Sequence, residues 1–205
     1  MNWTDNAVMR GLGKICDFIF LNVIWLVCSI PVFTIGASTT ALYTVMLKLV
    51  KNEEGYIVKG FFKAFASNFK KSTILWLIIL AAACVSGADF YVSGMMVAPL
   101  NNIFRVIFIV LGFIVLSVFI YVFPLTARYE NSVKNTLKNA LLLSIAKLPY
   151  TLLMIVITAG PVILTFMTVK TMMIGIMLWI VIGGALVAWV NSFILRRVFT
   201  IFEKE

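Results

Sequence analysis

Long apolar runs separated by short basic segments dominate this chain. Four of these runs are each long enough for one crossing, because a helix needs about 20 apolar residues to span the hydrocarbon core of a membrane. They cover residues 72–93, 102–127, 149–169 and 172–195. The pattern predicts an all-α, polytopic helical membrane protein that forms a single membrane domain over residues 1–205.

The first apolar run, residues 15–47, is long for one span and short for two. Pro31 interrupts it, and proline cannot continue a helix. Thr34 is then a suitable N-cap for a new helix. We expect a hairpin with spans at about 13–30 and 34–50, which makes six spans. No cleavage site of small residues follows the first span, so we expect it to be retained rather than removed as a signal peptide.

The positive charges predict the orientation. The chain has 17 Lys and Arg against 8 Asp and Glu, and all but Arg105 and Lys170 fall in four segments. These are the N-terminus with Arg10 and Lys14, residues 48–71, residues 128–147, and the tail from Arg196. Because Lys and Arg mark the cytoplasmic side, we expect a multi-pass plasma-membrane protein with both termini in the cytoplasm. Five spans with the N-terminus outside is the alternative.

Two cytoplasmic segments have apolar and basic residues at helical spacing. We expect both, at about 57–71 and 132–148, to form amphipathic elbow helices in the membrane interface, with aromatic rings at the acyl boundary. They overlay at an offset of 75 residues, where Val58-Lys59 matches Val133-Lys134, so an internal repeat is predicted. The candidate residues for docking lipid or a partner are Lys59, Phe62, Lys63, Phe65, Phe69, Lys134 and Lys138.

A few polar residues lie within the predicted spans, where they are costly and therefore functional candidates. Asn22 is expected to hydrogen-bond to another helix. Asp89 and Arg105 flank an outer turn and could form a salt bridge across it. A ligand site is conceivable at the start of the second span, where helix N–H groups lack partners. Its candidate residues are Thr34, Ser38, Thr39 and Thr40.

Composition argues against several function classes. The chain has no histidine, no paired acids for acid–base work and no glycine-rich phosphate loop. We therefore expect no enzymatic activity and no catalytic, cofactor or metal site. The positive charge lies in loops beside the membrane rather than on an isolated basic face, so nucleic acid is not an expected partner.

One combination of motifs is more specific. The segment from Pro31 to Tyr43 is followed by Glu53-Glu54-Gly55-Tyr56, and then by Phe61-Phe62-Lys63-Ala64-Phe65 and Asn68-Phe69-Lys70. From about Gly11 to the second elbow, the chain resembles the YesL-like family of bacterial integral membrane proteins, a domain of unknown function. The resemblance implies a link to carbohydrate-uptake systems in Gram-positive bacteria, with no known site residues to transfer.

These features favour an accessory or interaction subunit of a carbohydrate ABC-type importer. Its expected partners are membrane lipids and the permease or nucleotide-binding subunits. A stand-alone small-solute transporter and a structural membrane protein without a transport role are the alternatives. A transporter usually carries ionisable or helix-breaking residues near mid-membrane, and few are found here.

Overall fold

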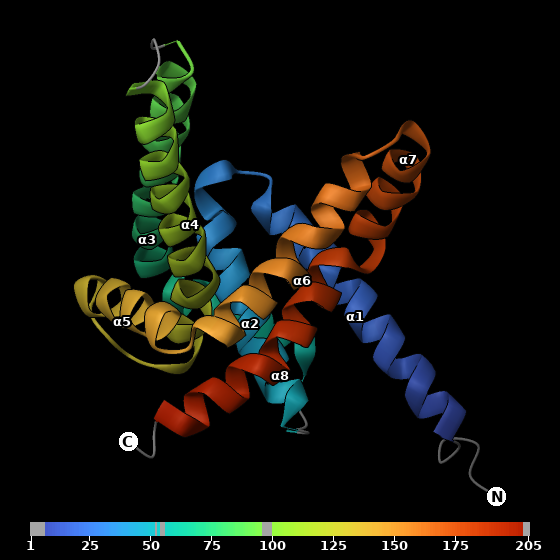
Figure 1. Cartoon of the computed structure of the whole chain (residues 1–205). Coiled ribbons are helices and arrows are strands. Elements are labelled where there is room, and N and C mark those ends of the chain that lie inside the picture. The colour runs from blue at the N-terminus through green and yellow to red at the C-terminus, as the bar shows by residue number, and fades with distance from the viewer. Residues whose placement is uncertain (1–6, 52, 54–55, 96–99, 203–205) are drawn as a thin grey trace, which may run out of the picture.

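A computed structural model describes residues 7–51, 53, 56–95 and 100–202, and the regular structure in these ranges is entirely helical. This confirms the all-α prediction. Figure 1 shows the helices in space. Their bounds are α1 Ala7–Ser29, η2 Val32–Thr34, α2 Ile35–Val50, α3 Ile57–Ser93, α4 Leu100–Arg128, α5 Val133–Ala146, α6 Leu148–Phe166, α7 Val169–Leu178, η3 Trp179–Gly183 and α8 Gly184–Phe202.

Several helices are long and apolar enough to cross a membrane. Within the described residues, five such stretches are found: Val32–Val50, Ile57–Ser93, Asn101–Arg128, Leu148–Phe166 and Val169–Thr200. The protein is therefore a multi-pass membrane protein. Helix α1 is 23 residues long and is not one of these five stretches.

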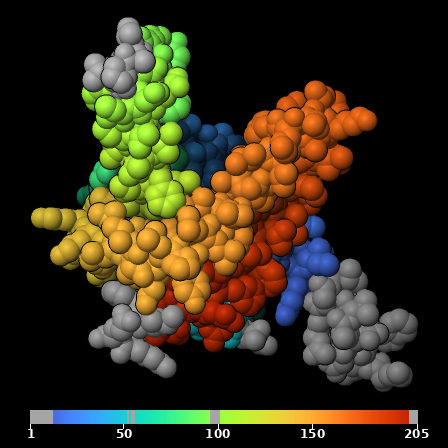
Figure 2. Space-filling view, in the orientation of Figure 1, coloured from blue at the N-terminus to red at the C-terminus, as the bar shows by residue number. Residues whose placement is uncertain are grey.

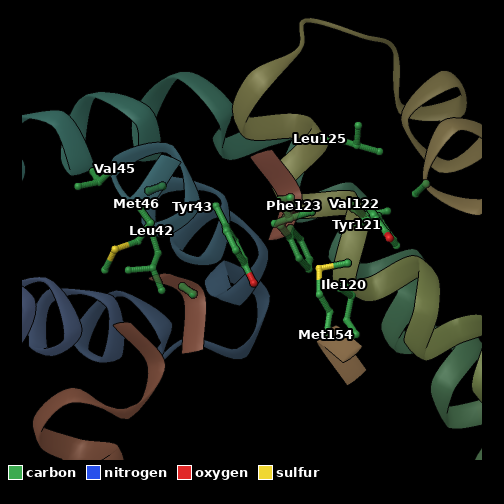
Figure 3. Close-up of a cluster of buried hydrophobic side chains, with 14 of the residues drawn as sticks. Leu42, Tyr43, Val45, Met46, Ile120, Tyr121, Val122, Phe123, Leu125 and Met154 are labelled. Atoms are coloured by element: carbon green, nitrogen blue, oxygen red, sulfur yellow. The ribbon is translucent and has the colours of Figure 1, made fainter. Parts of the chain in front are cut away.

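Helix α2 lies at the centre of the molecule and contacts α1, α3, α4 and α8. Its small residues allow this close packing, as is usual between membrane helices. Gly36 shows how tight the packing is, because a Cβ atom there would overlap the backbone oxygen of Ser72 and the side chain of Trp76 on α3. The larger side chains of α2 belong to the core shown in Figure 3, where Tyr43 lies on the side of α2 towards Ile120 and Phe123 of α4 and Leu42 and Met46 lie on the side away from them.

Two helical hairpins rise from this centre and diverge. Figure 1 shows the α3–α4 hairpin on one side and the α6–α7 hairpin on the other. The space-filling view in Figure 2 shows an open notch between them, with the dark blue N-terminal part of the chain at its floor. The two hairpins are therefore joined mainly through the central helices.

The predicted break in the first apolar run is present. Helix α1 ends at Ser29, Pro31 is extended, and α2 begins at Ile35 after the short 3-10 turn η2. Thr34 occupies the N-cap position but makes no side-chain capping bond. Its hydroxyl instead donates to the carbonyl oxygens of Cys28 and Pro31 at 2.6 Å each, which secures the turn between the two helices.

The first elbow differs from its prediction as a separate helix. Residues 57–71 continue without a break into the following span, so that α3 is one helix of 37 residues. The predicted boundary lies where the basic segment meets the apolar run at residue 72, but the lysines before it are good helix formers and no glycine or proline lies there to end the helix. A pair of lysines at such a position therefore indicates where the helix meets the membrane interface rather than where the helix ends.

The second elbow is a separate helix. Ser132 caps α5 by accepting a hydrogen bond from the Asn135 N–H at 3.3 Å. The helix ends at Lys147, whose backbone angles (φ −121°, ψ 44°) are not helical, and α6 follows directly. The two units of the predicted repeat thus differ in their connection between elbow and span.

A π-helical turn interrupts the last apolar run. The sequence predicts one span over 172–195, whereas α7 and α8 are joined by the π-helical η3, Trp179–Gly183. The hydrophobic pattern does not reveal this turn, because a π-turn adds one residue without changing the apolar character of the run.

Candidate functional site

The phenylalanines of the first elbow only partly face outward. Phe61 is fully buried in the core, Phe65 is half-buried against it, and Phe62 is 49% exposed. The Phe61 and Phe65 rings stack with centroids 6.3 Å apart, and Phe65 contacts Phe69 edge to face. The expectation that the aromatic rings of this elbow lie at the acyl boundary is wrong for Phe61. Helical spacing groups side chains on one face of a helix but does not indicate whether lipid or protein covers that face.

A basic pocket lies where α2 ends and α3 begins. Lys48, Lys59 and Lys63 line a cavity of about 290 Å³. Its apolar floor comes from Val45, Leu49 and Ile57. Ammonium groups around an apolar floor suit an anionic group joined to an apolar body, or the acidic surface of a partner protein. We call this feature the three-lysine pocket.

The acid on this pocket is already paired. Glu53 also lines it and forms an ion pair with Lys51 at 3.6 Å. Sequence reasoning named Lys59 and Lys63 but missed Lys48, because Lys48 belongs to the preceding helix. Only the folded connection between the two helices brings the three lysines together.

The lysines of the second elbow lie elsewhere. Lys134 and Lys138 are exposed on α5, and they do not line the three-lysine pocket. The described residues therefore give the two elbows separate basic surfaces.

Asn22 is fully buried and connects α1 to the π-helical turn. Its Nδ2 donates to the carbonyl oxygens of Trp179 at 3.0 Å and Ile180 at 2.8 Å. Its Oδ1 accepts a hydrogen bond from the Ala185 N–H at 2.9 Å. All three backbone groups belong to the segment where the regular helical ladder is interrupted. Both donor hydrogens and one acceptor position of the amide are therefore used within the protein.

The polar cluster that opens α2 is likewise occupied by internal bonds. Ser38 lies 2.6 Å from the Ser29 hydroxyl, Thr40 lies 2.9 Å from the Ser72 hydroxyl, and Thr39 accepts from the Trp25 indole at 3.3 Å. Of these three, Ser38 and Thr40 are fully buried. The cluster therefore joins α2 to α1 and α3.

Asp89 and Arg105 are not joined in the structure. The ion pair found among the described residues is Lys51–Glu53. Arg105 instead lies against Gly94 at the end of α3, where a Cβ atom would be 3.4 Å from Nη2. The described residues also contain no group of three or more His, Cys, Asp or Glu side chains placed to hold a metal ion.

A second buried asparagine was not predicted from the sequence. Asn191 on α8 is fully buried, and its Nδ2 donates to the Thr158 hydroxyl of α6 at 3.0 Å. An amide inside an apolar run was the signal that singled out Asn22, and the same signal applies to Asn191.

Comparison with known proteins gives the relationships of this chain. A family described as "Protein of unknown function, DUF624" matches residues 18–90. Uncharacterized protein YesL of Bacillus subtilis (strain 168) is 30% identical over 158 residues, which cover 73% of this chain and 74% of YesL. Uncharacterized protein YteU of the same organism is 30% identical over 160 residues, covering 75% of this chain and 70% of YteU. No solved structure matches the chain. The protein therefore belongs to the DUF624 family and is a distant relative of YesL and YteU.

Proposed function

We propose that this protein is a non-enzymatic accessory subunit of the bacterial plasma membrane, which docks a partner through its cytoplasmic face. The partner we propose is the permease or nucleotide-binding subunit of a carbohydrate ABC-type importer. The carbohydrate context rests on the resemblance to YesL-like proteins. The docking role rests on the three-lysine pocket.

The proposal includes six spans with both termini in the cytoplasm. Figure 1 supports it, since the start of α1, the α2–α3 connection, the α4–α5 connection and the end of α8 lie towards the same end of the molecule. The C-terminal ends of α1, α3 and α6 lie towards the opposite end. With six crossings, all the basic segments meet the cytoplasm, as the positive-inside rule requires.

The three-lysine pocket carries the docking proposal. Lys48, Lys59 and Lys63 surround an apolar floor, and two aromatic side chains, Tyr56 and Phe62, are exposed near it at the start of α3. Aromatic groups beside cations are typical of interface centres. A complementary partner surface would present carboxylates to the lysines and an apolar side chain to the floor.

Co-purification from native membranes tests the docking. We would compare wild type with the triple variant Lys48→Glu, Lys59→Glu and Lys63→Glu, and use Lys134→Glu with Lys138→Glu as the control for added negative charge. Importer subunits identified by mass spectrometry should be recovered with wild type and with the control and be lost with the triple variant. Equal recovery with the triple variant, or no importer subunit with wild type, would contradict the proposal.

Cysteine accessibility tests the topology. Single cysteines at Lys14, Lys51 and Lys134, in a chain whose three natural cysteines are replaced, should all react only when a reagent can reach the cytoplasm. Labelling of the Lys14 position from outside intact cells would establish five spans instead.

A further inference from the structure

The centre of the molecule contains a cavity of about 230 Å³ that is separate from the three-lysine pocket. Residues of α1, α2, α4, α6, η3 and α8 enclose it, so most of the predicted spans contribute to its wall. Its walls include parts of α4 and α6, the helices on either side of the notch in Figure 2. Val162 on this wall is 40% exposed, so the cavity wall reaches the surface of the protein there.

The lining is mostly apolar and carries no charged side chain. No Asp, Glu, Lys or Arg lines the cavity, and its apolar surface far exceeds its polar surface. The aromatic side chains on the wall are Trp25, Tyr43, Phe119, Phe123 and Trp179. An ion would lose its hydration here without gaining a counter-charge, which is strongly unfavourable.

A few neutral polar groups interrupt this apolar lining. Thr39 and Thr158 line the cavity from α2 and α6. The Thr39 hydroxyl accepts a hydrogen bond from the Trp25 indole N–H at 3.3 Å. The Thr158 hydroxyl accepts one from Asn191 Nδ2 at 3.0 Å. Neither hydroxyl donates its own hydrogen to a partner among the described residues.

These two threonines differ from others in the same helices. The hydroxyls of Thr40, Thr44 and Thr165 donate to the carbonyl four residues earlier, which is the usual arrangement for a helical threonine. Thr39 and Thr158 accept from a neighbouring side chain and keep their hydrogens available at the cavity wall. Both hydroxyls can therefore donate a hydrogen bond to a molecule in the cavity.

Tyr43 completes the polar set of the lining, and Asn191, which does not line the cavity, donates from its Nδ2 to the Thr158 hydroxyl. Figure 3 shows the Tyr43 hydroxyl directed towards the space between α2 and α4. Asn191 Oδ1 has no hydrogen-bond partner among the described residues. Asn191 is fully buried, and an unsatisfied buried acceptor of this kind costs about 1–3 kcal/mol.

We propose that this cavity binds a neutral, mainly apolar molecule about the size of one substituted ring, held by one hydrogen-bonding group. An apolar cavity of about 150 Å³ is known to hold benzene, so a volume of about 230 Å³ accommodates a ring with small substituents. A hydroxyl on that ring can accept a hydrogen bond from Thr158 or Tyr43, which both line the cavity. A free sugar is excluded, because most of its hydroxyls would find no partner.

Fluorescence quenching provides the test, with 4-bromophenol as the probe. Its bromine quenches indole fluorescence on contact, and Trp25 and Trp179 line the cavity. Full-length protein in mild detergent should show saturable quenching above the linear quenching from probe in the micelle. Phenol should compete for the saturable part, and glucose should not.

Three variants locate the site. Val162→Phe and Ala188→Leu both place extra side-chain volume at the cavity wall and should abolish the saturable quenching. Thr158→Val removes one hydroxyl at nearly constant shape and should weaken binding about tenfold, which corresponds to about 1.4 kcal/mol. Thr44→Val is the matched control, since Thr44 does not line the cavity, and should bind as wild type. Absence of saturable quenching in wild type, unchanged binding in both filled variants, or displacement of the probe by glucose would overturn the proposal.

Discussion

The side chain of Asn22 accepts a hydrogen bond from the backbone N–H of Ala185 at 2.9 Å, across 163 residues of sequence. The same amide donates to two carbonyl oxygens of the π-helical turn that precedes Ala185. One side chain thereby satisfies three backbone groups where the helical ladder is interrupted. Within a membrane such groups have no water to bond, so α1 and the π-turn stabilise each other.

Replacing Asn22 by leucine should destabilise the protein by about 2 kcal/mol, since it leaves buried backbone groups without partners. Unfolding in a mixed detergent series, followed by circular dichroism, measures the change. Asn102→Leu is the control, because Asn102 is exposed on α4 and should differ little from wild type. Equal stability of wild type and Asn22→Leu would show that the π-turn does not need the amide.

Gly36→Ala should be strongly destabilising. The added methyl group would overlap the backbone of Ser72, which cannot move without shifting α3 against α2, and overpacking typically costs about 1–3 kcal/mol. Gly112→Ala should instead be neutral or stabilise by up to about 1 kcal/mol, because that position in α4 has open space and alanine is the better helix former. Thermal unfolding of both variants measures the difference. Similar melting temperatures for the two would contradict the close α2–α3 packing.

The helix positions were largely predictable from hydrophobic runs and from one proline. Pro31 divided the first run correctly because its effect on the backbone is local. The single helix α3 was not predictable, since the lysines at 70 and 71 are compatible with both a continuous helix and a break. The π-turn at Trp179–Gly183 depends on Asn22, which lies far away in the sequence, and no local pattern reveals such a partner.

Phe61 and Phe62 are adjacent in the sequence but should respond differently to truncation. Phe61 is fully buried in the core, and Phe62 is 49% exposed. Phe61→Ala should cost about 3–5 kcal/mol, whereas Phe62→Ala should cost clearly less, because much of its ring lies outside the core. Denaturation of the two variants under identical detergent conditions tests the assignment. Equal losses would indicate that both rings are buried to a similar extent, in lipid or in protein.

The candidate sites were less predictable than the helices. Sequence reasoning identified Lys59 and Lys63, but the third lysine of the pocket, Lys48, comes from the preceding helix. It also placed a ligand site in the Thr34–Thr40 cluster, where the folded protein pairs most polar groups internally. Thr39 alone of the four candidates lines the central cavity, and its partners on that wall lie on helices that are distant in the sequence.

The hydrogen bond between Thr40 and Ser72 provides a direct test of the packing role of the cluster. The two hydroxyl oxygens are 2.9 Å apart, and both residues are fully buried. In a double-mutant cycle with Thr40→Val and Ser72→Ala, we expect a coupling energy of about 0.5–1.5 kcal/mol, the range for a hydrogen bond between membrane helices. Thr44→Val paired with Ser72→Ala should show no coupling, because Thr44 donates to the Thr40 carbonyl rather than to Ser72. Zero coupling for Thr40 and Ser72 would mean that this contact does not stabilise α2 against α3.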